Sequence, residues 1–252
     1  MYQSKYYSIT QRKEILFKED IDSEAIRDIK RCIEMINRYL GITDYYLMVR
    51  DNCLDFMEDS LHNGPGNPDG FVRANRHFLN ALNSYYVWQE YAKNNPLNDE
   101  EKHLVDAIKR EGVLELANRI RNRIVHYAPA ITEMSYDVLN ERNYITIHPS
   151  AYFSEKEQNG FNRKILDYLK NNPKLDAVGF IRDFMSDFTE LFNEIGKIVR
   201  EDYQNWIGCL LKYVPNTPPD CYNSYLVSTD DIEQISVGRT LELLSEKETL
   251  LS

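Results

Sequence analysis

Apolar residues recur at the spacing of an α-helix through most of the first 130 residues, and this periodicity constrains the fold more than any other feature. The first repeat places Ile26, Ile29, Ile33 and Ile36 on one helical face. It predicts a helix that begins at Asp22 and ends near Tyr39. The same spacing, with polar residues that can begin each helix, predicts three further helices at about 43–57, 71–92 and 98–127.

The second half of the chain has a different pattern. Segments 135–139 and 144–148 alternate β-branched or aromatic residues with polar ones around a turn-like sequence, which predicts a small hairpin. Helical spacing returns over 161–170 and 175–212, and one last helix is expected within 229–252. The predicted fold is mainly α: an antiparallel helical bundle with a small β-hairpin insertion and extra C-terminal helices. We expect a helical domain at 1–130, consisting of an N-terminal arm and four helices. Residues 131–252 are expected to pack on the same core.

Charge and composition exclude several classes of protein. The 30 lysine and arginine residues are outnumbered by 40 acidic ones, so the chain lacks the excess of positive charge with which proteins coat nucleic acids. No apolar run reaches the roughly 20 residues that span a bilayer, and the first 20 residues lack the apolar region of a secretory signal. The four cysteines have no CxxC pairing. We therefore expect a cytoplasmic protein with reduced cysteines and without membrane contact.

One short segment near the end of the fourth predicted helix concentrates chemically useful side chains. Arg121 and Asn122 are followed by His126, which provides a fixed cation, an amide and a side chain that titrates near neutrality. At about 100° per residue, these three side chains lie about 100°, 200° and 240° from Ile120, on the polar side of the helix. One helix would hold half a site, and two copies packed around a dyad would bring two arginines and two histidines together.

The motif Arg-Asn-x-x-x-His near the end of a long helix resembles the HEPN family (higher eukaryotes and prokaryotes nucleotide-binding domain). The preceding helix adds to the resemblance, because Arg76, Asn80 and Ser84 are similar to the polar helix that faces the motif helix in some relatives. The resemblance implies a dimeric α-helical bundle and, in many members, metal-independent RNA cleavage by toxins or antiviral effectors. Some toxin members carry a modified tyrosine two residues after the histidine. Here Tyr127 follows directly, so we do not carry that regulation over.

The resemblance implies a metal-independent endoribonuclease that cleaves single-stranded RNA through attack by the 2′-hydroxyl. His126 would move the proton, Arg121 would stabilise the charged phosphate, and Asn122 would orient either group. Additional contacts to RNA are expected from Arg119, Arg123, Arg76, Asn80 and Tyr127. The expected partners are RNA, a second copy of the chain, and an antitoxin or regulatory protein.

Other functions fit the same residues. Arg121 and Asn122 could cap or staple neighbouring helices around a partly buried His126 and have only a structural role. A non-catalytic HEPN-like module could use the same basic cleft to bind RNA or a nucleotide. A helical scaffold for protein assembly is a third interpretation. No cofactor or metal is expected, because nucleotide-binding glycine loops are missing and the histidines lack partners at metal-ligand spacing. The acidic residues at helical spacing over 183–194 are interpreted as a solvated face.

Overall fold

The computed structural model describes residues 6–10, 23–62, 68–108, 112–126, 129–137, 139, 142–149, 153–212, 224–228, 234–235 and 240. The chain forms two compact units, each described separately below. The larger unit comprises residues 44–197, and the smaller combines residues 1–43 with 198–252. Helix α1 (Ser23–His62) contributes its first part to the smaller unit and its remainder to the larger.

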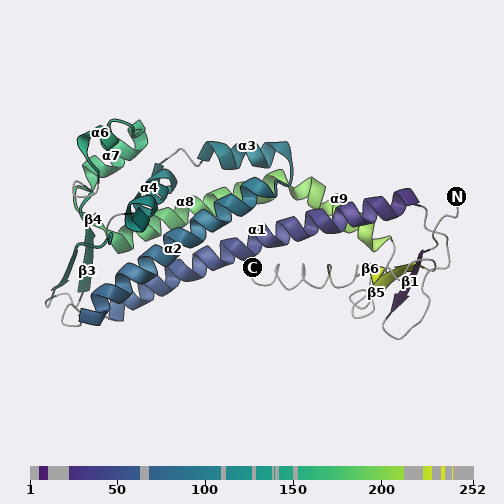
Figure 1. Ribbon diagram of the computed structural model, residues 1–252, viewed down its shortest axis with the longest axis horizontal. Coiled ribbons are helices and arrows are strands. Elements are labelled where there is room, and N and C mark those ends of the chain that lie inside the picture. Colours follow the sequence, from purple (N-terminus) through teal and green to yellow (C-terminus); the bar gives the residue numbers. More distant parts are fainter. Residues whose placement is uncertain are drawn as a thin grey trace. The chain divides into compact units, whose positions relative to one another are not determined.

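The larger unit is a helical bundle with a small sheet at one end (Figure 1). After α1 come α2 (Pro68–Asn94), α3 (Asp99–Ile108) and α4 (Gly112–His126). Strands β2 (Glu133–Asp137) and β3 (Arg142–Ile147) form an antiparallel hairpin, and β4 (Leu175–Asp176) adds a third strand beside β3. Short helices α6 (Glu155–Gln158) and α7 (Arg163–Asn171) precede the long α8 (Ala177–Ile198).

Aromatic side chains hold α1, α2 and α8 together in the core of this unit. Phe56 of α1 meets Phe78 of α2 edge-on, with ring centroids 5.3 Å apart. Phe188 of α8 lies 5.2 Å from Tyr85 and 4.8 Å from Trp88, both on α2. All five side chains are almost completely buried. Because large aromatic residues remove the most apolar area from water, these contacts fix α2 against α8.

The smaller unit packs α9 (Arg200–Leu211) against the first part of α1. Ile29 and Ile36 are completely buried beside Leu210. Burial, with a hydrogen bond to the neighbouring Cys209, raises the pKa of Cys32 to about 12 and keeps it a neutral thiol at physiological pH. A separate sheet in this unit has the order β1 (Tyr6–Thr10), β5 (Ser224–Ser228) and β6 (Gln234–Ile235), with antiparallel pairing throughout.

The mainly α fold with a small β insertion is confirmed, but two predicted helix boundaries are wrong. The helix predicted to end near Tyr39 continues through α1 to His62. Gly41 does not break it, because Ile42 is buried and the Thr43 hydroxyl donates to the Tyr39 carbonyl 3.0 Å away. The helix predicted over 98–127 is instead α3 and α4. Gly112, at the start of α4, has a φ of +60°, a conformation that glycine adopts without steric cost.

The C-terminal half also departs from the sequence prediction. The stretch 175–212 is divided into β4, α8 and α9, with a helix boundary at Val199. The last predicted helix, 229–252, lies mostly outside the described residues, and its described part includes strand β6 at 234–235. The two compact units divide the chain after residues 43 and 197, and α8 supplies aromatic side chains to the core around α2. No helix in the described ranges combines the length and apolar character needed to cross a bilayer.

Glu101 is a buried carboxyl group in the first turn of α3, and it makes stability depend on pH. It accepts a hydrogen bond from the Leu97 backbone N–H (3.1 Å), while its own backbone N–H donates to the Asn98 side chain (2.8 Å). Its Oε1 has no hydrogen-bond partner among the described residues. Burial raises the pKa of Glu101 to about 7. The folded state therefore favours the protonated form, and stability is lost as pH rises from about 4.5 through 7.

We predict that Glu101→Gln increases the free energy of unfolding at pH 8 by about 1–3 kcal/mol, because glutamine removes the cost of burying an ionised carboxylate whose pKa is raised to about 7. Glutamine keeps an oxygen for the Leu97 N–H without carrying charge. Denaturant unfolding at several pH values measures the effect, which should vanish below pH 4.5. Glu100→Gln, at an exposed neighbouring position, provides the matched control. Equal stability of Glu101→Gln and the parent at pH 8 would contradict the prediction.

Candidate functional site

The predicted site lies on α4, whose apolar stripe decides which side chains face outward. Leu116, Ala117 and Ile120 are completely or almost completely buried, so the opposite face of the helix is polar. Asn122 and His126 are exposed on that face. Helix α4 packs between α2 on one flank and α7 on the other. The last turn of α4 therefore borders two surfaces, one formed with α2 and the other with the α6–α7 segment.

Arg121 is fixed against α2. Its Nε donates to Asn83 Oδ1 over 2.9 Å, and its guanidinium carbon lies 4.2 Å from the centre of the Tyr86 ring. A second nitrogen, Nη1, donates to Asn122 Oδ1 over 3.0 Å. This bond leaves Nδ2 as the group that Asn122 can offer to a ligand. Arg121 thus staples α4 to α2, as the structural interpretation of the motif expected, and also orients Asn122.

Arg119 fastens the other flank of α4. Its Nε donates to Glu115 Oε1 over 2.8 Å, and its guanidinium carbon lies 4.7 Å from the centre of the Phe161 ring. It also reaches the Gly160 carbonyl oxygen at 3.4 Å. The second Glu115 oxygen accepts from Asn162 Nδ2 over 2.9 Å. These contacts give Arg119 a structural role between α4 and the segment before α7.

A cavity of about 240 Å³ lies beside Arg119, and we call it the arginine cavity. Asn122, Arg123 and His126, all in the last turns of α4, line one side of it. The segment around α6 forms the other side. Among the described residues, the lining consists of Arg119, Asn122, Arg123, His126, Phe153, Glu157 and Phe161. The structure therefore brings Asn122 and His126 together with Arg123, while Arg121 is not among the described lining residues.

Glu157 is a residue of this cavity that sequence reasoning missed. One carboxylate oxygen lies 3.6 Å from the nearest Arg123 nitrogen. The other accepts from the Ser154 backbone N–H (2.9 Å) and hydroxyl (2.7 Å), which forms a capping box on α6. The Ser154 hydroxyl and backbone N–H, and to a smaller extent Arg123, hold the pKa of Glu157 below its usual value. The Ser-x-x-Glu spacing of Ser154 and Glu157 predicts the cap of α6. The position of Glu157 opposite α4 depends on tertiary packing, which the spacing does not predict.

A second cavity of about 460 Å³ lies between α2 and the end of α4, and we call it the apolar cavity. Its lining consists of Asn75, Arg76, Leu79, Ile124, Val125, His126 and Pro129. Asn75 Oδ1 accepts from the Ile131 backbone N–H over 2.9 Å, and Nδ2 donates to the Phe71 carbonyl oxygen over 3.2 Å. Its amide is therefore engaged in holding the chain beside α2. His126 lines both cavities.

The remaining predicted contacts have different locations. Arg76 is exposed and lines the apolar cavity. Asn80 is exposed on α2 but lines none of the cavities formed by the described residues. Ser84 is buried and donates to the Ala81 carbonyl oxygen of its own helix over 2.8 Å, so it does not face α4 from a polar surface. Tyr127 lies outside the described residues.

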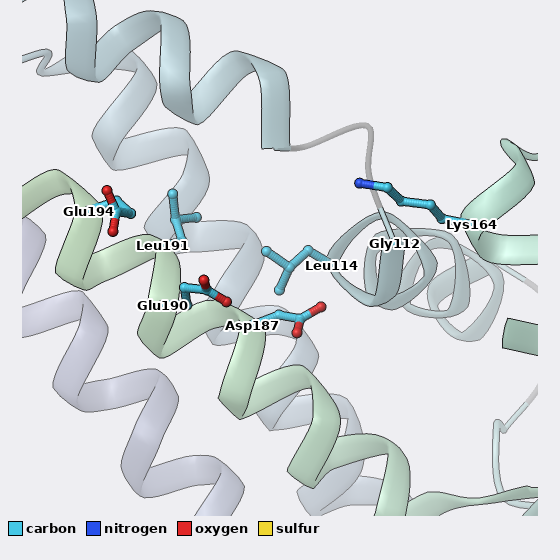
Figure 2. Close-up of a pocket in the computed structure, with 7 residues that line it drawn as sticks. All are labelled: Gly112, Leu114, Lys164, Asp187, Glu190, Leu191 and Glu194. Carbon is cyan, nitrogen blue, oxygen red and sulfur yellow. The ribbon is translucent and has the colours of Figure 1, made fainter.

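Acidic side chains line a third cavity, of about 290 Å³, shown in Figure 2. Asp187 and Glu190 of α8 project beside each other, and Lys164 extends from α7. Partial burial, with the nearby Glu190 and Asp183, raises the pKa of Asp187 above its usual value. Repulsion among carboxylates makes this cavity unfavourable for phosphate. Within the described ranges, no three histidine, cysteine or acidic side chains are grouped so that they could hold a metal ion.

The histidines outside α4 have simpler surroundings. His148 Nε2 lies 3.2 Å from Glu133 Oε2, across the β2–β3 hairpin. His103 is exposed on α3, and His77 is half-buried on α2. Neither lines a described cavity. His126 is therefore the histidine that the described part of the chain places beside arginine and asparagine in a cavity.

Comparison of the chain with protein-family models, curated proteins and solved structures found no match.

Proposed function

We propose that this protein is a metal-independent endoribonuclease of the HEPN type that cleaves single-stranded RNA. The observation that carries the proposal is the grouping of His126, Asn122 and Arg123 in the arginine cavity at the end of α4. The cavity offers a proton-transfer group, an amide donor and a cation to one phosphate. Such groups can perform phosphate-ester transfer without a metal ion.

The reaction transfers the phosphorus from the 5′-oxygen of one nucleotide to the 2′-oxygen of its neighbour. The 2′-hydroxyl loses its proton as its oxygen bonds to phosphorus. The bond between phosphorus and the 5′-oxygen breaks, and that oxygen takes up a proton. The products are a 2′,3′-cyclic phosphate and a 5′-hydroxyl. His126 serves as one proton carrier, since an imidazole ring can both accept and donate a proton.

The arginines have different parts in this proposal. Arg123 and Asn122 hold the non-bridging phosphate oxygens, where charge increases in the transition state. Arg121 acts as a positioning residue in the single chain, because its bonds to Asn83 and Asn122 fix the Asn122 amide. Arg119 keeps α4 and the 160–162 segment together. Arg76, Asn80 and Tyr127 remain proposed contacts to the rest of the RNA.

A homodimer with α4 of each chain near the dyad would supply the second proton carrier as the partner's histidine. This arrangement follows from the half-site character of a single α4 and from the resemblance to HEPN proteins. A cytoplasmic toxin or antiviral effector, held in check by an antitoxin or regulatory protein, is the corresponding biological role.

A non-catalytic module that binds RNA or a nucleotide is the second candidate. The observation in its favour is the proximity of Glu157 to Arg123, which offsets positive charge where a reacting phosphate would lie. Binding without cleavage would need hydrogen-bond donors in the arginine cavity but no group that transfers a proton. The assay below separates the two candidates.

We predict that His126→Ala reduces RNA cleavage at least 100-fold, the lower range of what proton transfer by a positioned side chain contributes. The free energy of unfolding should change by less than about 1 kcal/mol, because the side chain is exposed. Arg121→Lys should also be severely impaired, since lysine cannot make both the Asn83 and Asn122 bonds. The measurement is cleavage of a labelled single-stranded RNA with EDTA present.

His103→Ala provides the matched control, since that histidine is exposed on α3 away from both cavities. It should retain full activity. RNA binding by the parent protein without cleavage would support the non-catalytic module. Unfolding of His126→Ala together with an inactive parent would support a structural role for the motif.

Glu157→Gln should strengthen binding of RNA by roughly twofold to fivefold, the factor expected from releasing an exposed ion pair. Glutamine still accepts from Ser154, so the α6 cap is retained. Glu194→Gln changes the net charge equally on α8 and serves as the control. The gain should be measured by titration of a labelled oligonucleotide at low and high salt, and should shrink at high salt. Equal affinities for the two variants would argue against phosphate beside Arg123.

The affinity for single-stranded RNA should depend weakly on salt. Few cations border the two cavities, and Arg119 is engaged by Glu115. A log–log plot of affinity against salt concentration should have a slope of about −1 to −3, from about 0.7 per phosphate contacted. A slope steeper than about −6 would indicate an extended basic track and contradict a confined site.

A further inference from the structure

His126 lies at the junction of two cavities with different chemistry. The arginine cavity presents Arg123 and Asn122, whereas the apolar cavity presents mainly hydrocarbon from Leu79, Ile124 and Val125. Val125 keeps 46% of its surface exposed. An RNA chain alternates in the same way, because each charged phosphate is followed by a nucleoside with a largely apolar base face.

We infer that the apolar cavity receives the nucleobase next to the cleaved phosphodiester of a single-stranded RNA. The inference rests on the proposed function and assigns a substrate subsite to it. When Arg123 and His126 hold the phosphate, the RNA strand can continue past His126, which also lines the apolar cavity. The base then covers the exposed surface of Val125. Exposed Arg76, on α2, attracts the next phosphate.

The lining of the apolar cavity indicates how the base is recognised. Asn75, its amide residue, uses both side-chain atoms on the backbone of Phe71 and Ile131. Recognition therefore depends on apolar contact with the base face and charge contact with the backbone, which tolerates different bases. The base must leave its stack to enter, so the subsite selects single-stranded or looped RNA over a duplex.

A second copy of the chain is the competing occupant of this apolar surface. The charge of Arg76 favours RNA instead, because this arginine borders the cavity and complements a polyanion. The protein carries a net charge of −10, so an arginine beside an apolar cavity is a local departure from its overall charge.

The test compares two uncleavable oligonucleotides with the same 2′-O-methyl backbone, one of uridines and one abasic throughout. We expect the parent protein to bind the uridine oligonucleotide about fivefold more tightly, because the base covers apolar surface that the abasic chain leaves exposed. Val125→Ser should reduce this ratio to about twofold or threefold. Val87→Ser, at a similarly exposed valine on α2 that lines no described cavity, should leave it unchanged.

The outcomes separate this subsite from the proposed function. Equal binding of both oligonucleotides, with RNA cleavage intact, overturns the subsite alone. Failure to bind either oligonucleotide, with no cleavage of RNA, overturns both. Light scattering on the same variants tests the competing occupant, because conversion of a dimer to a monomer by Val125→Ser would assign the cavity to a second copy of the chain.

Discussion

The packing of α2 against α8 is the interaction on which the candidate site depends. Tyr85 and Trp88 bury one face of α2 against Phe188 and fix the helix in the core. The flank of the same helix carries Asn83 and Tyr86, which hold Arg121. One rigid helix therefore supports the core and orients the polar end of α4. A site whose supporting residues belong to a packed helix keeps its geometry better than one built on loops.

The arginines of α4 show how an acidic protein can maintain a small cationic site. Arg119 is neutralised by Glu115, and Arg121 is held by neutral groups on Asn83 and Tyr86. Arg121 is therefore immobilised and in turn holds the Asn122 amide, which lowers the entropy that a ligand contact to Asn122 would cost. Arg123 lies beside Glu157, and because both side chains are partly exposed, water and salt weaken the attraction. Arg119 thus has a structural role, Arg121 positions Asn122, and Arg123 is the arginine that contacts the phosphate in the proposed mechanism.

The sequence predicted the local pattern of this site but not its tertiary partners. The helix containing the motif, its apolar stripe and the exposure of Asn122 follow from a period of 3.6 residues, and the structure agrees. The partner of Arg121 could not be deduced, because 38 residues separate Asn83 from it along the chain. Glu157 was missed for the same reason. The break between α3 and α4 escaped prediction because helical periodicity continues across it.

The relation between Glu157 and Arg123 links the structure to the proposed chemistry. Ser154 holds the Glu157 carboxylate through two hydrogen bonds and lowers its pKa, so it stays ionised near neutral pH. An anion thus already lies beside Arg123, and a phosphate must share or displace that contact. A dianionic or doubly contacted group competes better than one carboxylate oxygen at 3.6 Å. Glu157 therefore favours ligands that engage His126 and Asn122 together with Arg123 over anions that contact Arg123 alone.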